Sequence, residues 1–517
     1  MKRLLSTLAA MGLVAAALTV AGPAAAHEGR SHVDRPDRQL LRWASDTWAS
    51  LDAMTDETTG LPSDNITGDL AAAASYTSPT NIGGYLWSTV TARDLGIISH
   101  RDARSRMAAT LETLETLERN DASGMYYNWY DPATGTKLTT WPDSGDPVHP
   151  FLSTVDNGWL AASLRIVREA DPRLARQAER LYDSMDFAAF FDPAGAAGLP
   201  AGTNRGGFWE VAPPDCSVAA PMYNGSGEEA FYTCHHYDTT VSESRIATYL
   251  GIADGTIPAT ALYGTHRTMP LGCDWAWQEQ LPTGATRTYQ GFDVWEGAYS
   301  YAGMRFVPSW GGSMFEALMP DLLVPETTWG AKSWRLNHPI TVAVQKHHGL
   351  EDAGYGAWGF SPASDPFGDY AEYGVDLAGM RSDGYTSDRE QTDVDIDRPG
   401  CTTGTAPDPE FGDGVVTPHA SFLALPYDRK GVLANLAHLE NDLGAYGPGG
   451  FYDSVAVGSG TVAERYLSLD QSMIMAAIGN ELTGDSLKRY FVDKQMEKRL
   501  RPAMAAQVFS SEWKARE

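Results

Sequence analysis

Three acidic residues stand where helices are predicted to begin, which sets them apart from the solvated carboxylates of this chain. Glu243 falls in the first turn of a predicted helix, Asp470 at the N-cap of an apolar one, and Asp156 just before a helix expected to start at Asn157. A helix N-terminus favours the ionised form of a carboxyl group through the helix dipole and the free backbone amides. A pair of carboxyl groups, one protonated and one ionised, can act as general acid and general base. Each of the three can also be an ordinary cap with no chemistry.

Glu243 and Glu316 raise a further question about protonation. A general acid must hold its proton, so burial or a neighbouring carboxylate would have to raise the pKa of Glu243 against the helix dipole. Glu316 lies in an otherwise apolar segment, Ser-Met-Phe-Glu-Ala-Leu-Met. A carboxylate among apolar residues is either buried and paired or lines a ligand site. Both roles stay open for Glu316.

The elements that must position these residues are predicted to be helices. After Ser99 the pattern Ser-His-Arg-Asp is typical of a helix start, and an apolar stripe follows. Period-two strand patterns are scarce, so the fold class is expected to be all-α. Long Gly/Pro/aromatic loops separate the helices, and loops of this length are usually functional. These loops are residues 121–156, 192–240, 354–420 and 445–468.

Composition limits the kinds of partner. The chain has 517 residues and a formal net charge of −27, which repels nucleic acid and anionic membrane surfaces. Such a surface suits a neutral ligand. The 15 Trp residues offer aromatic faces of the kind that bind sugar rings, although most are expected to be core. We expect a monomer with no nucleic-acid or membrane partner.

The N-terminus has the layout of a cleaved signal peptide. Lys2 and Arg3 precede an apolar run, and three alanines ending at Ala26 precede His27. The apolar run is short for a membrane span. We therefore expect residues 1–26 to be removed and residues 27–517 to form a single secreted domain, extracellular or periplasmic.

Four cysteines remain after that cleavage, and an even number outside the cytoplasm favours two disulfides. Three pairings are possible. The favoured one joins Cys216 to Cys234, across a short Gly/Pro-rich loop, and Cys273 to Cys401. No metal is expected: the side chains of Cys234-His235-His236 point apart, and the acidic run 393–397 lacks the glycine and the final glutamate of a calcium loop.

Several motifs, in order, resemble the glucoamylase-like glycoside hydrolases that include bacterial endo-β-1,2-glucanases and the C-terminal domain of cyclic β-1,2-glucan synthases. The resemblance covers nearly all of residues 40–485. Its motifs are Tyr76-Thr-Ser-Pro-Thr-Asn-Ile-Gly-Gly-Tyr85, Tyr127-Asn-Trp-Tyr-Asp131, Ser153-Thr-Val-Asp-Asn-Gly158, Ser309-Trp-Gly-Gly-Ser313, Trp358-Gly-Phe-Ser361, Val416-Thr-Pro-His-Ala420, Gly450-Phe-Tyr-Asp453 and Leu469-Asp-Gln471.

This resemblance implies an (α/α)6 barrel with long active-site loops at one end and no cofactor. It implies an inverting endo-acting hydrolase of a β-linked glucan, with β-1,2-glucan as the first substrate. Glu243 is then the general acid, Asp470 activates water, and Asp156 holds the sugar or relays a proton. Substrate-binding candidates are Glu316, Trp129, Tyr130, Trp159, Trp310 and Trp358, and at least two of the aromatic residues are expected to stack on sugars.

The chain departs from the family pattern in two insertions, near residues 200–237 and 380–413, and at Pro362, where synthase-like members carry Glu. Pro362 favours the hydrolase branch. The insertions put the substrate in doubt more than the chemistry, since fold alone does not determine substrate. Two alternatives therefore stay open: a hydrolase of another extracellular or cell-wall polysaccharide, and a glycan-binding protein without catalysis.

Overall fold

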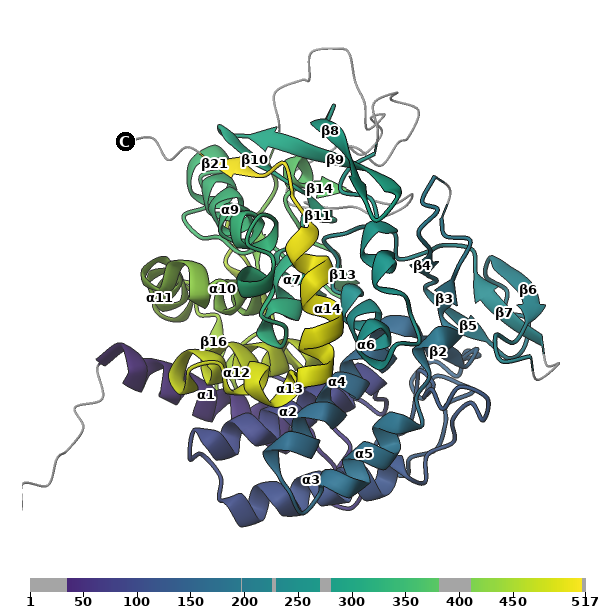
Figure 1. The fold of residues 1–517 in the computed structure, drawn as a ribbon. Coiled ribbons are helices and arrows are strands. Elements are labelled where there is room, and N and C mark those ends of the chain that lie inside the picture. The colour runs from purple at the N-terminus through teal and green to yellow at the C-terminus, as the bar shows by residue number, and fades with distance from the viewer. Residues whose placement is uncertain (1–34, 197, 226–228, 270–279, 381–410, 514–517) are drawn as a thin grey trace, which may run out of the picture.

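A computed structural model describes residues 35–513, except residues 197, 226–228, 270–279 and 381–410 (Figure 1). The predicted signal peptide, the Cys273–Cys401 pairing and most of the second insertion lie outside the described residues. Within the described part of the chain, no helix is long and apolar enough to cross a membrane.

Six helices form the inner frame of the molecule. α4 packs against α2 and α6, α12 packs against α2 and α10, and α10 packs against α7. The ends of this series, α6 and α7, are joined by hydrogen bonds from Arg245 to the backbone of α7. The bounds are α2 (Pro79–Asp94), α4 (Thr154–Ala170), α6 (Arg245–Asp254), α7 (Met314–Leu318), α10 (Pro418–Leu423) and α12 (Ser468–Thr483).

Close approach between inner helices depends on two glycines of α2. A Cβ atom at Gly83 would lie 2.8 Å from the carbonyl oxygen of Trp159 in α4, and one at Gly84 would lie 2.5 Å from Oγ of Ser472 in α12. Almost every residue of α2 is buried, as expected for a helix surrounded by others. The Gly-Gly pair therefore sets the spacing of three inner helices.

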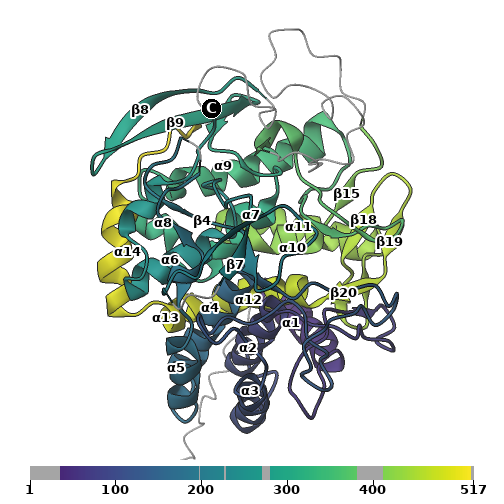
Figure 2. The same ribbon diagram turned by 90° about the vertical axis from the view of Figure 1, so that its right-hand side faces the viewer.

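An outer layer of helices covers the inner ones (Figures 1 and 2). α3 is one of these outer helices. The Ser99 hydroxyl accepts a hydrogen bond from the Asp102 amide, which confirms the predicted helix start. Met107, Leu111 and Leu114 are buried, which confirms the predicted apolar stripe. The outer and connecting helices are α1 (Arg35–Ala53), α3 (His100–Leu114), α5 (Ala175–Asp183), α8 (Glu326–Trp329), α9 (Trp334–His347), α11 (Leu425–Asn441), α13 (Ser486–Phe491) and α14 (Lys494–Ala506).

The connections contain more β-structure than the all-α prediction allowed. The described residues form eight small sheets, of two to four strands each. The prediction missed them because most strands are two or three residues long, too short to show an alternating pattern. The many helices are as predicted, and the described β-structure lies in the segments between them and, for β21, after α14.

Two sheets have four antiparallel strands each, and in Figure 1 one lies at the top and the other at the right. The first comprises β8 (Thr283–Tyr289), β9 (Phe292–Tyr301), β10 (Met304–Phe306) and β21 (Glu512–Trp513); the second comprises β2 (Phe151–Ser153), β5 (Gly207–Trp209), β7 (Glu229–Thr233) and β6 (Ser217–Pro221). A third sheet has three strands, β15 (Val415–Val416), β18 (Ser454–Ala456) and β19 (Thr461–Ala463).

The remaining sheets are strand pairs. They are β1 (Asn65–Thr67) with β20 (Arg465–Leu467), β3 (Phe191–Asp192) with β4 (Thr203–Asn204), β11 (Ser309–Trp310) with β14 (Gly379–Met380), β12 (Ala363–Ser364) with β13 (Tyr370–Ala371), and β16 (Tyr446–Gly447) with β17 (Gly450–Phe451). Of these, only β11 and β14 run parallel.

Candidate active site

Glu243 and Glu316 meet where α6 and α7 begin. Glu243 lies just ahead of α6, whose N-cap is Ser244, so the prediction that it occupies the first turn was wrong by two residues. Its Oε2 accepts a hydrogen bond of 2.5 Å from Trp159 Nε1. Its backbone amide donates to Glu316 Oε2 at 2.7 Å. Glu243 is partly exposed, whereas Glu316 is buried.

Burial controls the protonation of this pair. It raises the pKa of Glu243 well above the ordinary value, and the negative charge of Glu316 raises it further, against the hydrogen bond from Trp159. Burial also raises the pKa of Glu316, to about 7, although the Glu243 amide, Ser242 and Arg245 oppose this. Two close carboxyl groups in a low dielectric cannot both ionise easily. Glu243 therefore holds its proton to a higher pH than an ordinary glutamate does, against the effect of the helix dipole.

Asp156 is the third residue of α4, which begins at Thr154 rather than at the predicted Asn157. Its backbone amide donates to the N-cap Ser153, as in an ordinary helix start. Its two carboxylate oxygens accept hydrogen bonds from Thr80 (2.6 Å) and from the Asn128 side chain (3.0 Å). Asp156 is partly exposed, so these oxygens can accept further hydrogen bonds from a ligand.

Asp470 is the third residue of α12 and not its N-cap, which is Leu467. It is 3% exposed. Burial raises the pKa of Asp470 to about 7; a hydrogen bond from Asp453 lowers it and the charge of Asp64 raises it. Burial raises the pKa of Asp453 well above its usual range, and the adjacent Asp470 adds to this. Asp453 is therefore the member of the pair that carries the proton.

His419, near the start of α10, lies with its Nδ1 3.2 Å from Asp470 Oδ2. Burial lowers the pKa of His419 to about 4, so the imidazole is neutral at neutral pH. Asp470 thus titrates near neutrality without a cation beside it.

Asp64 joins the two halves of the site, and sequence reasoning missed it. Its carboxylate accepts hydrogen bonds from the side chains of Asn81 (2.9 Å) and Asn65 (3.0 Å), and it is partly exposed. Burial raises the pKa of Asp64, the two amides lower it, and the charge of Asp156 raises it. Since the charge of Asp64 also raises the pKa of Asp470, the carboxyl groups influence one another's pKa in succession. This carboxylate series is Glu316, Glu243, Asp156, Asp64, Asp470 and Asp453.

Several polar side chains of the site occupy the same position in the first turn of their helices. Asn81, Asp156, Glu316 and Asp470 are each the third residue of an inner helix. In three of the four, a serine three residues earlier caps the helix by accepting from that residue's amide. The Ser-x-x-polar spacing was a sequence signal for Asn81, Asp156 and Glu316. Asp64, Asp453 and His419 carry no such signal, because Asp64 and Asp453 lie in connections and His419 looks like a core residue.

The aromatic candidates divide by exposure. Tyr130, Trp159 and Trp358 are at most 2% exposed, so the prediction that they contact substrate is not supported by their positions. Trp159 packs edge-on against Trp87, and its indole N–H donates a hydrogen bond to Glu243. Trp129 and Trp310 are partly exposed, and for them sugar stacking stays a prediction.

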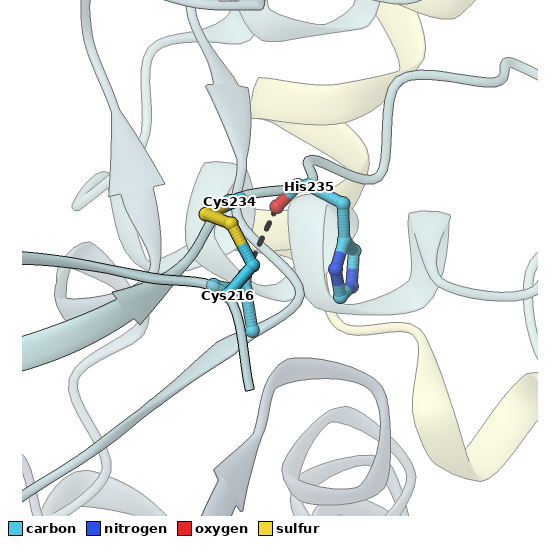
Figure 3. Close-up of a disulfide and its surroundings, with 4 residues drawn as sticks. Cys216, Cys234 and His235 are labelled. Carbon is cyan, nitrogen blue, oxygen red and sulfur yellow. Dashed lines mark hydrogen bonds between the residues drawn. A yellow bond between two sulfur atoms is a disulfide. The ribbon is translucent and has the colours of Figure 1, made fainter. Parts of the chain in front are cut away.

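The insertion at residues 200–237 supports the acid-bearing segments. The predicted Cys216–Cys234 disulfide is present, and Figure 3 shows it beside His235. It joins β6 to β7, and β7 pairs through β5 with β2, which leads directly into α4 and Asp156. From Cys234 the chain runs to Glu243 within nine residues. Tyr237 lies on this stretch, where burial and the charges of Glu243, Asp156 and Glu316 raise the pKa of its hydroxyl.

Asp321, Glu326 and His338 could in principle hold a metal, since one ligand atom of each lies within 4.8 Å of the others. Cations of the protein already neutralise both carboxylates. Arg245 Nε lies 2.7 Å from Glu326, and Lys488 Nζ lies 3.3 Å from Asp321. A divalent cation would meet two positive charges there, so the group is better described as a buried ion-pair network.

Comparison with known proteins confirms the resemblance to glucoamylase-like proteins. Residues 281–494 match the Glycoamylase family model, whose description is "putative glucoamylase", and residues 42–194 match a family of unknown function, DUF3131. The chain is 23% identical over 573 residues to the cyclic β-(1,2)-glucan synthase NdvB of Rhizobium meliloti (strain 1021). That alignment covers 88% of this chain but 18% of the synthase, so the chain spans less than a fifth of that relative.

Solved structures share the fold at low identity. The endo-β-1,2-glucanase of Chitinophaga pinensis, in complex with sophorotriose and glucose, has a TM-score of 0.60 at 16% identity, covering 90% of this chain and 98% of that one. The endo-β-1,2-glucanase of Talaromyces funiculosus with sophorose has a TM-score of 0.58 at 12% identity, covering 91% and 90%. A β-1,2-glucanase of Parabacteroides distasonis has a TM-score of 0.60 at 14% identity, covering 90% and 60%.

Proposed function

We propose that this protein is a secreted glycoside hydrolase that cleaves β-1,2-glucan internally, with inversion, on an (α/α)6 barrel. The observation that carries the proposal is the carboxylate series. The pair at one end includes Glu243, whose pKa is raised well above the ordinary value, and the pair at the other end includes Asp470, whose pKa is about 7. Glycoside hydrolysis needs this combination of acid and base.

Glu243 is the proposed general acid. It is partly exposed, its pKa is raised well above the ordinary value, and the Trp159 indole N–H donates a hydrogen bond to one of its oxygens. Its proton passes to the glycosidic oxygen, directly or through a substrate hydroxyl, as the bond from that oxygen to the anomeric carbon breaks. Glu316 maintains the raised pKa of Glu243 and fixes its backbone.

Asp470 is the proposed base. A water molecule attacks the anomeric carbon from the opposite face and its proton passes to Asp470, so the two proton transfers balance. Asp470 is nearly inaccessible, so the proton reaches it by relay through water or through Asp64. Asp156 holds the sugar at the point of cleavage through its remaining hydrogen-bonding capacity. Inversion places the acid and base about 6.5–9.5 Å apart across the scissile bond.

β-1,2-glucan is the proposed substrate because the structural neighbours named above act on it and the strongly acidic surface suits a neutral chain. A second candidate is another extracellular polysaccharide. The disulfide-bonded insertion favours it, since this segment lies beside the acid and departs from the family pattern. A panel of purified neutral glycans, scored by release of reducing ends, separates the two.

The decisive experiment is product analysis on β-1,2-glucan by chromatography, with NMR detection of the first anomer formed. Wild-type protein should release short oligosaccharides of inverted configuration. Glu243→Gln should lower kcat by roughly 10²–10⁴-fold. Glu112→Gln, at an exposed glutamate of α3, is the matched control and should retain activity. Binding of the glucan without any product would identify a glycan-binding protein instead.

Secretion is proposed from the N-terminal pattern alone. Mass spectrometry of protein recovered from the medium or the periplasm should find a chain that begins at His27. A chain that retains residues 1–26 would contradict this.

A further inference from the structure

Three aromatic side chains form a compact group beside the carboxylate series. The ring centroids of Tyr76, Trp129 and Trp141 lie 5.5 Å (Tyr76–Trp129), 5.3 Å (Tyr76–Trp141) and 5.7 Å (Trp129–Trp141) apart. All three are partly exposed, unlike most aromatic residues of this chain. We call these three residues the aromatic platform.

Backbone hydrogen bonds hold the platform in place. Thr77 and Tyr130, which follow Tyr76 and Trp129, pair through two hydrogen bonds of 2.9 and 3.0 Å. The Trp141 amide and carbonyl are both used within its own turn, by Asp146 and Gly145. The rings are therefore preformed, and binding a ligand on them would cost little ordering.

A polar edge joins the platform to the proposed catalytic groups. The side-chain amide of Asn65 donates to Asp64 (3.0 Å) and to the Tyr76 hydroxyl (3.3 Å). Arg465, which is exposed, donates to Asn65 Oδ1 at 2.8 Å. On the other side, Asn128 is the neighbour of Trp129 and donates to Asp156. The platform thus adjoins the carboxylate series at both Asp64 and Asp156.

We infer that the aromatic platform and the Asp64–Asn65–Arg465 edge form a subsite for one pyranose ring of a neutral glucan. The inference rests on the proposed function and extends it by naming where a sugar beyond the cleavage point is held. Aromatic faces cover the apolar faces of a sugar ring, while carboxylate, amide and guanidinium groups bind its hydroxyls. Here both kinds of group lie side by side and adjoin the same series through the hydrogen bonds of Asn65 and Asn128.

The test uses linear β-1,2-linked glucose oligomers of two to seven units and the inactive Glu243→Gln protein. Binding is measured by calorimetry and by tryptophan fluorescence. Adding Trp141→Ala should weaken binding of the longer oligomers about tenfold and reduce the fluorescence change. Tyr76→Phe, which keeps the ring and removes the hydroxyl, should weaken binding about two- to threefold. Trp513→Ala is the matched control, because Trp513 is 49% exposed but lies in β21, outside the platform.

The possible results test the proposed subsite and the proposed catalytic function separately. Unchanged affinity and fluorescence in the Trp141→Ala and Tyr76→Phe variants, with the wild type active on these oligomers, would overturn the subsite and leave the function intact. Platform-dependent binding with no hydrolysis by the wild type would overturn the catalytic proposal and support the subsite. An absence of both binding and hydrolysis would overturn the subsite and β-1,2-glucan as the substrate.

Discussion

Burial raises the pKa of the two proposed catalytic carboxyl groups in different settings. Glu243 sits beside a second glutamate, so its proton is held by a neighbouring negative charge as well as by the low dielectric. Asp453 donates a hydrogen bond to Asp470. This hydrogen bond lowers the pKa of Asp470 and raises the pKa of Asp453. Burial therefore favours an acid at one position and a titratable base at the other.

These settings predict the pH profile of kcat/KM. Asp470 must be ionised, so activity should rise with a midpoint near its pKa of about 7, well above the pH of roughly 4 at which an exposed aspartate ionises. Activity should fall again at higher pH as Glu243 loses its proton. Asp64→Asn removes a negative charge that raises the pKa of Asp470, so in the residual activity the acidic limb should move to lower pH. Rates measured across the pH range, with Glu112→Gln as control, check this; an acidic limb near pH 4 in the wild type would contradict it.

At the scale of elements, a single guanidinium holds α6 against α7. Arg245 donates to the carbonyl oxygens of Ser242 (2.7 Å), Glu316 (2.9 Å) and Ala317 (2.7 Å). Glu326 neutralises Arg245 and also accepts hydrogen bonds from Tyr249 and His338. The positions of Glu243 and Glu316 thus depend on a buried ion pair behind them.

Glu326→Gln should therefore be strongly destabilising. It leaves the buried charge of Arg245 unpaired, which costs about 3–5 kcal/mol of unfolding free energy. The free positive charge should also lower the pKa of Glu243 and move the basic limb of the pH profile to lower pH. Denaturant unfolding and the pH profile measure the two effects. Glu497→Gln, which breaks an exposed pair with Arg501, should cost less than about 1 kcal/mol. Equal losses for the two variants would refute the role of the buried pair.

We also predict that the Cys216–Cys234 disulfide stabilises the fold and supports activity. Cys216 and Cys234 are 18 residues apart, and a cross-link over such a loop contributes about 3 kcal/mol by restricting the unfolded chain. The Cys216→Ser/Cys234→Ser double variant should lose roughly this much stability, measured by denaturant unfolding. Because the hairpin leads into the Glu243 segment, it should also lose activity at temperatures where it stays folded. Full activity there would show that the insertion does not support the acid.

The limits of sequence-based prediction follow from the same elements. The helix start at the capping Ser99 was predicted correctly, whereas α4, capped by Ser153, was expected to begin three residues too late. The roles of Asp156, Glu243, Glu316 and Asp470 stay predictions. The short strands were not predictable, because two or three residues show no period. Asp64 and Asp453 were not predictable either, since the tertiary contacts of two connections bring them to the site. Burial of Trp159 and Trp358 likewise depends on how the inner helices pack, which their motifs do not show.

At the scale of the whole molecule, the net charge of −27 bears on substrate class. The Asp and Glu residues outnumber the basic ones, so a polyanion would be repelled, and salt would weaken that repulsion. A neutral glucan carries no charge to be repelled. The dependence of kinetics on ionic strength therefore distinguishes these substrate classes without altering the protein.

We expect kcat/KM on β-1,2-glucan to change by less than about twofold between low and high NaCl, because no long-range charge interaction contributes to encounter. Glu316, Asp470 and Asp453 are buried and the other members of the carboxylate series are only partly exposed. Salt should therefore screen their interactions little, and kcat should also be nearly constant. Initial rates over a salt series, at the pH of maximal activity, measure this, and circular dichroism confirms that the fold is unchanged. Hydrolysis of an anionic glycan, with a kcat/KM that rises steeply with salt, would instead indicate an anionic substrate. An anionic glycan would then replace β-1,2-glucan as the proposed substrate, and the roles of Glu243 and Asp470 would be tested on that glycan.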